Sequence, residues 1–427
     1  MDRLLNRIRA NAWGSLTAIP ELLGVAPTGK PQAELWMGAH PGAPSQVDRG
    51  RGPRSLVELI AEDPDGELGA DTAARFGPRL PFLLKVLAAE EPLSLQVHPD
   101  AAQARQGFAE EEARGVPIDA PHRNYRDSSH KPEMICAIGD FEGLVGYREI
   151  AQTLKLLDAL DVPQLAPFAR ALRNPDQEAA LRAATTHVLM LPARLRASVV
   201  DAVAAACRRL ASNGSPYAEA CAAVAGLAER HPGDPGVAVA LLLNHIRLRE
   251  GEAVFLAAGM PHSYLHGVVV EILANSDNVL RCGLTDKHID VGELLRIMAF
   301  RAGPVEILSP EIPKGPEGPR SSEGPWSPGS PERAGPDPGE EVYATPVADF
   351  RLSRLRSTAG RGPYLLDTAG PQILLCVRGT ATATGADGEV LDLARGQSVY
   401  VRAGEPRVAV TVEGDDGLVF RATVPCS

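Results

Sequence analysis

The sequence has few of the residues that hold small secreted proteins together. It contains only six cysteines in 427 residues, and aromatic residues make up 4% of the chain. The cysteines are scattered singly, and no two of them form a CxxC pair. This pattern excludes a disulfide framework and a zinc site built from thiolates. We therefore expect the cysteines to be small buried hydrophobic residues in a reducing compartment.

The sequence also lacks long apolar runs and an excess of basic charge. No window approaches the ~20 apolar residues that cross a bilayer. Residues 1–15 carry charges where a secretory signal would have an apolar core. Lysine and arginine number 43 against 54 aspartates and glutamates, which gives a net charge of −11. Because nucleic acids and anionic membranes attract basic surfaces, we predict a cytoplasmic monomer that binds neither.

The chain divides into β-rich and helix-rich segments. Its length exceeds that of one hydrophobic core, and short apolar runs punctuated by glycine and proline favour strands at both ends. A middle block rich in Ala, Leu and Arg has helical spacing, and we expect its last helix to span residues 237–248. A Pro/Gly-rich segment with hardly any apolar residue is predicted to be a mobile loop. The predicted units are a discontinuous first β domain, a helical insertion, this loop and a C-terminal β domain without a metal site: residues 1–148 with 236–308, 149–235, 309–341 and 342–427.

Two segments repeat each other without gaps. Residues 251–262 (GEAVFLAAGMPH) align with residues 396–407 (GQSVYVRAGEPR). Both have a glycine turn, a short apolar strand and an Ala-Gly-x-Pro turn, a signature that resembles cupin barrels, although two unrelated β-hairpins can look alike by chance. The first copy ends in His262 and the second in Arg407. We predict a mainly β fold of two cupin-type (jelly-roll) β-barrels with an inserted α-helical domain, in which only the first barrel binds a metal.

The stretch LSLQVHP alternates apolar and polar residues. Successive side chains of a strand point to opposite faces, so Ser94, Gln96 and His98 project together from one face. That face offers a hydroxyl, a carboxamide oxygen and an imidazole in a row. By itself the pattern also fits an ordinary amphipathic edge strand that faces water.

A second polar motif, HKPE, leads into an apolar strand. Lys131 and Glu133 share a face by the same parity, although a surface ion pair explains the motif equally well. Together with Gln96, His98 and the turn residue His262, Glu133 completes a set of two imidazoles, a carboxylate and a carboxamide oxygen. Such a set suits zinc, or manganese, iron or cobalt. The spacing does not show that these segments meet.

Charged residues also follow the His262 turn. Glu271 stands within the apolar run VVVEIL, where a carboxylate is costly to bury unless it is paired, protonated or linked to a metal. Asp277 and Arg281 are four residues apart and share a face if the segment is extended. A structural salt bridge between these two residues is the alternative to a role in binding or catalysis.

At these residues the sequence resembles the type I mannose-6-phosphate isomerases, or phosphomannose isomerases, of the cupin superfamily. The resemblance covers the first β-rich region and residues 251–300. It rests on motifs that occur in the same order: NAWG, AELWMG, LPFLLKVL, LSLQVHPD, HKPEM, GMPHSYL and SDNVLRCGLTDKHIDV. It implies a zinc-dependent aldose–ketose isomerase that interconverts D-mannose 6-phosphate and D-fructose 6-phosphate in carbohydrate metabolism, including GDP-mannose biosynthesis. The first barrel is then the catalytic domain.

The resemblance also implies the site residues. One zinc ion per chain is bound by Gln96, His98, Glu133 and His262. Further residues lie around the phosphosugar: Ser94, Lys131, Tyr264, Glu271, Asp277 and Arg281.

The reaction moves a proton between C2 and C1 of the sugar through a cis-enediolate. Because a guanidinium is always protonated, we assign Arg281 to stabilising the developing negative charge and to binding substrate. The proton-transferring base stays open among Glu271, Asp277, Lys131 and a zinc-bound water. Ser94, Lys131 and Tyr264 are assigned to substrate binding.

Two other functions fit parts of the pattern. A non-catalytic cupin that binds a sugar phosphate is expected to lack one of the four ligand positions, and all four are present. Another metal cupin enzyme, such as an oxygenase or a sugar epimerase, is the second alternative. Mononuclear oxygenases favour several histidines and one carboxylate, so a glutamine ligand beside lysine and arginine fits a phosphosugar isomerase better.

Overall fold

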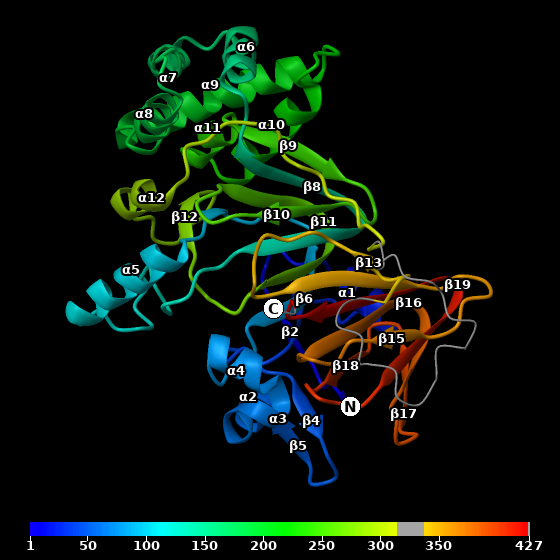
Figure 1. Cartoon of the computed structure of the whole chain (residues 1–427). Coiled ribbons are helices and arrows are strands. Elements are labelled where there is room, and N and C mark those ends of the chain that lie inside the picture. Colours follow the sequence, from blue (N-terminus) through cyan, green and yellow to red (C-terminus); the bar gives the residue numbers. More distant parts are fainter. Residues whose placement is uncertain (314–336, 426–427) are drawn as a thin grey trace.

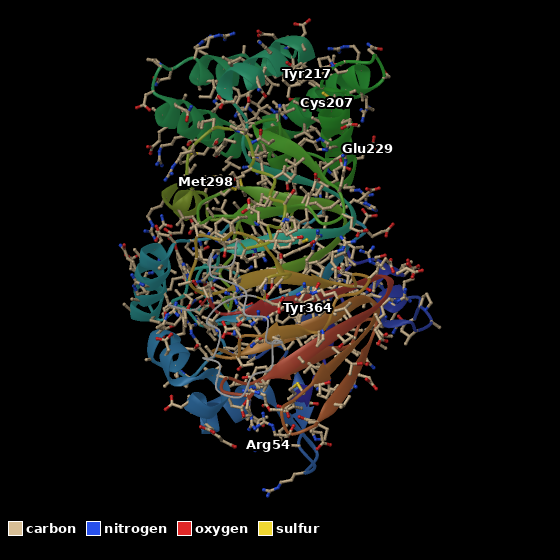
Figure 2. All side chains as sticks on the ribbon, turned by 45° about the vertical axis from the view of Figure 1, so that its right-hand side comes forward. Arg54, Cys207, Tyr217, Glu229, Met298 and Tyr364 are labelled. Atoms are coloured by element: carbon tan, nitrogen blue, oxygen red, sulfur yellow. The ribbon has the colours of Figure 1, made fainter. Side chains whose placement is uncertain are left out.

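The computed structural model describes residues 1–313 and 337–425. Two large antiparallel sheets lie one above the other, and a helical block covers the upper sheet (Figure 1). Figure 2 shows the same order, with Cys207 and Tyr217 in the helical block at the top and Tyr364 in the lower sheet. The predicted mainly β fold with an inserted helical block is confirmed.

The upper sheet has nine strands. They are β2 (Arg7–Arg9), β3 (Glu34–Met37), β6 (Phe82–Ala89), β7 (Leu95–Val97), β8 (Glu133–Tyr147), β9 (Leu243–Leu248), β10 (Ala253–Leu256), β11 (His262–Ala274) and β12 (Leu280–Gly283). β8 and β11 are its long strands, and each takes part in two layers. The start of β8 pairs with β10 and its end with β9, while β11 pairs with β7 at its start and with β6 further on. The register between β8 and β11 shifts near Gly267, where the sheet folds over.

The lower sheet has eight strands. They are β1 (Asp2–Arg3), β13 (Glu341–Val342), β14 (Arg351–Arg356), β15 (Tyr364–Leu366), β16 (Gln372–Thr384), β17 (Val390–Ala394), β18 (Ser398–Val401) and β19 (Val408–Thr423). Here β16 and β19 are the long strands that pass through both layers. In the described part of the chain, neither path of paired strands closes into a ring, so each jelly roll stays open. β4 (Gln46–Asp48) and β5 (Pro53–Ser55) form a separate hairpin.

The two copies of the sequence repeat have the same backbone conformation at their glycine turns, although Arg407 adopts a positive φ of 49° and its counterpart His262 begins a strand. In both, the first glycine adopts a positive φ, 84° at Gly251 and 80° at Gly396, a conformation that costs glycine little. The later glycines, Gly259 and Gly404, do so as well, with φ of 77° and 70°. We therefore interpret the repeat as a structural duplication.

Strand pairing extends this duplication beyond the repeat. Leu256 of β10 lies opposite Glu133 of β8, and Val401 of β18 lies opposite Gln372 of β16. Leu256 and Val401 hold the same place in the two copies, so Gln372 takes the place of Glu133. The lower sheet therefore has an amide where the upper sheet has a carboxylate.

Helices occupy two places. Those beside the β-sheets are α1 (Ala18–Leu23), α2 (Leu56–Glu62), α3 (Pro64–Leu68), α4 (Ala70–Phe76), α5 (Ala101–Ala113) and α12 (Val291–Ile297). Those of the helical block are α6 (Ile150–Leu160), η1 (Pro163–Leu165), α7 (Ala166–Leu172), α8 (Gln177–Leu189), α9 (Ala193–Ala211), α10 (Ala218–Arg230) and α11 (Gly236–Ala240). None of the helices in the described residues combines the length and apolar character of a membrane span.

Two local expectations differ from the structure. The predicted helix at 237–248 is wrong in its second half, because α11 ends at Ala240 and Leu243–Leu248 forms β9. These residues pair with the end of β8, and this tertiary pairing overrides their helical spacing. The expected strand around His98 is also shorter than the motif, since β7 covers only Leu95–Val97. Most of the predicted loop 309–341 lies outside the described residues, and beside it Glu311 bridges Val342.

The two sheets share one hydrophobic core. Leu84 and Val86 of the upper sheet pack in the same cluster as Ile373 and Phe420 of the lower one. A second cluster joins the helical block to the end of β8 and includes Tyr147. Five cysteines are described, and all are buried and free of disulfides.

A buried ion pair ties the lower sheet together. Both amino groups and the Nε of Arg421 are used: Nη1 lies 2.8 and 2.9 Å from the Glu340 carboxylate oxygens, Nε donates to Gln372 Oε1 at 2.6 Å, and Nη2 donates to Asp367 O at 2.6 Å. Ser353 Oγ also donates to Glu340. Arg421 and Glu340 are both fully buried. Satisfied in this way, the guanidinium is a structural element of the lower sheet.

We predict that Glu340→Gln destabilises the protein by about 3–5 kcal/mol, because it leaves the Arg421 charge buried without its counter-ion. Urea unfolding measures this change in the free energy of unfolding. The matched control is Glu62→Gln, which breaks an exposed ion pair with Arg54 and is expected to change little. Zinc content should stay normal in folded Glu340→Gln, and equal stability of the two variants would contradict the prediction.

Candidate metal centre

Three predicted ligands meet in the upper sheet. His98, Glu133 and His262 offer ligand atoms that all lie within 4.8 Å of one another. His98 Nε2 is 3.4 Å from Glu133 Oε1, and His262 Nε2 is 3.5 Å from Glu133 Oε2. The two imidazole centroids are 5.0 Å apart. β8 supplies the glutamate, β11 supplies His262, and His98 follows directly after β7.

Backbone carbonyls fix the orientation of both imidazoles. His98 Nδ1 lies 2.8 Å from Asn278 O, and His262 Nδ1 lies 3.0 Å from Met260 O. A neutral ring that donates through Nδ1 keeps a lone pair on Nε2. Both Nε2 atoms are buried and have no hydrogen-bond partner. Two orphaned lone pairs beside a carboxylate fit a divalent metal ion such as zinc.

Nearby charges and burial keep His98 and Glu133 in the protonation states that bind a metal. Burial and the charge of Lys131 lower the pKa of His98 to about 4, so its imidazole is neutral at pH 7. Burial opposes ionisation of Glu133, but Lys131 and His98 outweigh it and hold the pKa of this carboxyl well below its usual value. Lys131 Nζ lies 3.0 Å from Glu133 Oε1. Metal binding therefore needs little deprotonation at neutral pH.

Gln96, the fourth predicted ligand, stands beside this group. In the β7–β11 pairing, Gln96 lies directly opposite His262. Side chains at directly opposed positions leave the same face of a sheet. Gln96 also lies opposite Arg281 of β12. The strand register thus places Gln96 between His262 on one neighbouring strand and Arg281 on the other.

Behind the metal ligands lies a chain of buried polar groups. Tyr264 Oη donates to Glu133 Oε2 at 3.3 Å and to Glu271 Oε1 at 3.1 Å. Lys85 Nζ lies 3.1 Å from Glu271 Oε2 and 3.2 Å from Glu34 Oε1. Burial opposes the charge of Lys85, but the three glutamates raise the pKa of its ammonium. Burial raises the pKa of Glu271, and Lys85 only partly opposes this shift.

Lys85 and Glu34 were not among the predicted site residues. A signal for Lys85 is present, since it is the single charged residue of LPFLLKVLAA. The cost of burying a charge, which singles out Glu271 in its apolar run, applies equally to this lysine. Strand pairing then joins the two, because Lys85 lies directly opposite Glu271.

Asp277 and Arg281 do not form the salt bridge that was the alternative to a functional role. Asp277 Oδ1 instead lies 3.3 Å from His40 Nε2, another residue that sequence reasoning did not place in the site. Arg281 has its Nε buried without a hydrogen-bond partner. Burial lowers the pKa of Arg281, and the nearby charge of Arg126 adds to this effect.

Ser94 is the least engaged of the predicted residues. It is half-buried just before β7, and no hydrogen bond of its hydroxyl is found in the described part of the chain. The neighbouring Leu93 carbonyl accepts a hydrogen bond from Ser263 Oγ at 2.7 Å. Ser94 thus lies near the site without a fixed contact.

Comparisons with known proteins agree with this site. Residues 1–150 match the family described as phosphomannose isomerase type I, catalytic domain. The chain is 36% identical over 417 residues to mannose-6-phosphate isomerase of Escherichia coli (strain K12), covering 97% of this chain and 98% of the relative. It is 30% identical over 439 residues to the Homo sapiens mannose-6-phosphate isomerase, covering 97% and 96%. The Salmonella typhimurium mannose 6-phosphate isomerase, solved with bound substrate and zinc, matches with a TM-score of 0.84, 34% identity and full coverage of both chains.

The two antiparallel jelly rolls and the buried histidine–carboxylate group define a metal-binding protein of the cupin class. Within this class, the chain shares sequence identity with mannose-6-phosphate isomerases over nearly its whole length. The chain belongs to the type I phosphomannose isomerase family.

We predict that His262→Ala loses zinc, because it removes one of the two orphaned imidazole nitrogens from the site. Metal analysis after dialysis against a weak chelator should find about one zinc per wild-type chain and almost none in the variant. His266→Ala is the matched control, since His266 is exposed on the same strand. Equal zinc content in the two variants would contradict the assignment of His262 as a ligand.

Proposed function

We propose that the protein is a zinc-dependent isomerase that interconverts D-mannose 6-phosphate and D-fructose 6-phosphate through a cis-enediolate. The observation that carries this proposal is the pair of buried, unpartnered Nε2 atoms of His98 and His262 facing the Glu133 carboxylate. Family membership supports the choice of substrate, because the related Salmonella typhimurium structure is a mannose 6-phosphate isomerase that holds its substrate and zinc. We further propose that the protein works as a cytoplasmic monomer.

Gln96, His98, Glu133 and His262 are the residues that would hold zinc. Bound there, zinc would supply Lewis acidity toward the negative charge that develops on the sugar oxygens. The Lys131 ammonium contacts the Glu133 carboxylate. Tyr264 holds Glu133 and Glu271 in place through its hydroxyl. Ser94 and Lys131 complete the proposed contacts with the sugar.

We assign the proton transfer between C1 and C2 to Asp277. The other candidate side chains are engaged elsewhere, Lys131 with Glu133 and Glu271 with Lys85. The Asp277 side chain is 55% exposed, so substrate can reach it. Burial alone would raise the pKa of this carboxyl, but His40 and two lysines lower it overall. Asp277 is therefore ionised at neutral pH and able to accept a proton.

We assign the phosphate to Arg281 and its cationic neighbours. Burial lowers the pKa of Lys287, and the charges of Arg281 and Arg126 lower it further, as like charges do. In the described residues, no carboxylate forms an ion pair with any of them. A phosphate dianion would neutralise this positive charge and accept hydrogen bonds from the guanidinium groups.

The proposal is tested with a coupled assay that detects fructose 6-phosphate formed from mannose 6-phosphate. We expect turnover by the zinc-loaded protein, loss of turnover after complete chelation, and recovery when zinc is added back. A protein that binds mannose 6-phosphate and zinc without turnover would be a non-catalytic cupin and would refute the proposal. Full activity without metal would refute the zinc dependence.

The phosphate assignment makes a separate prediction. Lys287→Gln should raise KM for mannose 6-phosphate about tenfold with a smaller change in kcat, because a phosphate contact acts on ground state and transition state alike. Arg281→Gln should also lower kcat, by roughly 100-fold, because we assign it to the developing charge as well. Lys155→Gln, at an exposed position of α6, is the control and should behave as wild type. Unchanged KM in Lys287→Gln would contradict the phosphate assignment.

A further inference from the structure

His40 is the buried partner of the one carboxylate of the site that is open to solvent. The residue is only 4% exposed and follows β3 in the segment Gly38–Gly42. Its Nε2 lies 3.3 Å from Asp277 Oδ1. The two residues are far apart in sequence, so this contact exists only in the folded protein.

Two neighbours fix the proton and the plane of the His40 ring. The Gly42 N–H donates to His40 Nδ1 at 3.0 Å, so the neutral ring carries its proton on Nε2, toward Asp277. Trp36 packs edge-on against the imidazole, with ring centroids 4.8 Å apart. A Cβ at position 42 would come within 3.2 Å of His40 Nδ1, so glycine allows this close approach of the backbone. His40 is thus a preset hydrogen-bond donor.

The segment that carries Asp277 also contacts a metal ligand. Asn275 Nδ2 donates to Ala39 O at 3.4 Å, beside His40, and the Asp277 N–H donates to Asp127 Oδ2 at 2.8 Å. The next residue, Asn278, accepts the hydrogen bond from His98 Nδ1 through its carbonyl. The segment 275–278 therefore places the open carboxylate and orients a metal-ligating imidazole at the same time.

We propose that His40 is a positioning residue for the isomerisation: its Nε2–H holds the Asp277 carboxylate, in its ionised form, at the open side of the metal centre. This inference rests on the proposed function, in which Asp277 moves the proton. The titratable groups that act on the Asp277 carboxylate are His40, Lys131 and Lys85, and Asp127 binds its backbone amide. His40 is the group in direct contact with the Asp277 carboxylate, and through this contact it sets both the position and the ionisation of the carboxylate.

Two variants separate positioning from general structure. His40→Leu removes the donor at similar volume, whereas His40→Gln carries an amide N–H that can reach the place of Nε2. We expect His40→Leu to lower kcat about tenfold with little change in KM, and His40→Gln to recover most of that loss. His187→Leu, at an exposed position of α8, is the control. Zinc content is measured in every variant and should not change.

A readout independent of turnover is the pKa of Asp277 itself, from carbon-13 NMR of the carboxyl group, assigned with Asp277→Asn. Loss of the His40 contact removes a cause that lowers this pKa, so the pKa should rise in His40→Leu and stay closer to wild type in His40→Gln. An unshifted Asp277 pKa in His40→Leu, with normal wild-type turnover, would overturn this inference alone. A zinc-loaded wild-type protein that does not isomerise mannose 6-phosphate would overturn the proposed function and this inference with it.

Discussion

The site depends on one unbalanced set of buried charges. Glu34, Glu133 and Glu271 carry three carboxylates, and Lys85 and Lys131 bring two ammonium groups against them. Because His98 is neutral at pH 7, its imidazole does not supply the missing positive charge. Opposite charges nearby stabilise charges removed from water, so the Glu133 carboxylate favours a cation at the point where the imidazole lone pairs meet. A divalent metal ion there would satisfy both orphaned nitrogens as well.

The lower sheet solves the same burial problem without a metal. Leu273 lies opposite Glu133 in the upper sheet, and Thr423 lies opposite Gln372 in the lower one. Two residues earlier on the same strands stand Glu271 and Arg421. An anionic position in the upper sheet is therefore cationic in the lower sheet.

This exchange removes the need for a metal ion in the lower sheet. Arg421 carries the positive charge on the protein chain itself, and Glu340 neutralises it directly. The remaining guanidinium donors reach Gln372 and the Asp367 carbonyl. With its charges and donors satisfied, this position has a structural role, whereas in the upper sheet Lys85 pairs with the corresponding Glu271 and the neighbouring Glu133 faces the two imidazoles.

Much of this architecture could be predicted from local sequence patterns. The repeated glycine turns, the alternation in LSLQVHP and the carboxylate in VVVEIL each report a local constraint, namely a positive φ, a two-sided strand or a costly buried charge. β9 could not be predicted in this way, because Leu243–Leu248 also has helical spacing and only the edge of β8 decides its conformation. His40 carries no local signal, since its partner Asp277 is brought to it by the fold.

The position of Asp277 is fixed by chain segments on two sides of it. β11 supplies a metal ligand at its first residue and ends shortly before Asp277, so one strand connects the metal centre to the segment that carries this carboxylate. The segment after this strand is fastened to residues 39–40 on one side and to the segment around Asp127 on the other. Asp127 also accepts a hydrogen bond from Ser276 Oγ at 2.8 Å, which fixes the turn from within. An open carboxylate that is held from two sides needs little reorganisation to reach a substrate, which is the condition for efficient proton transfer beside a buried cation.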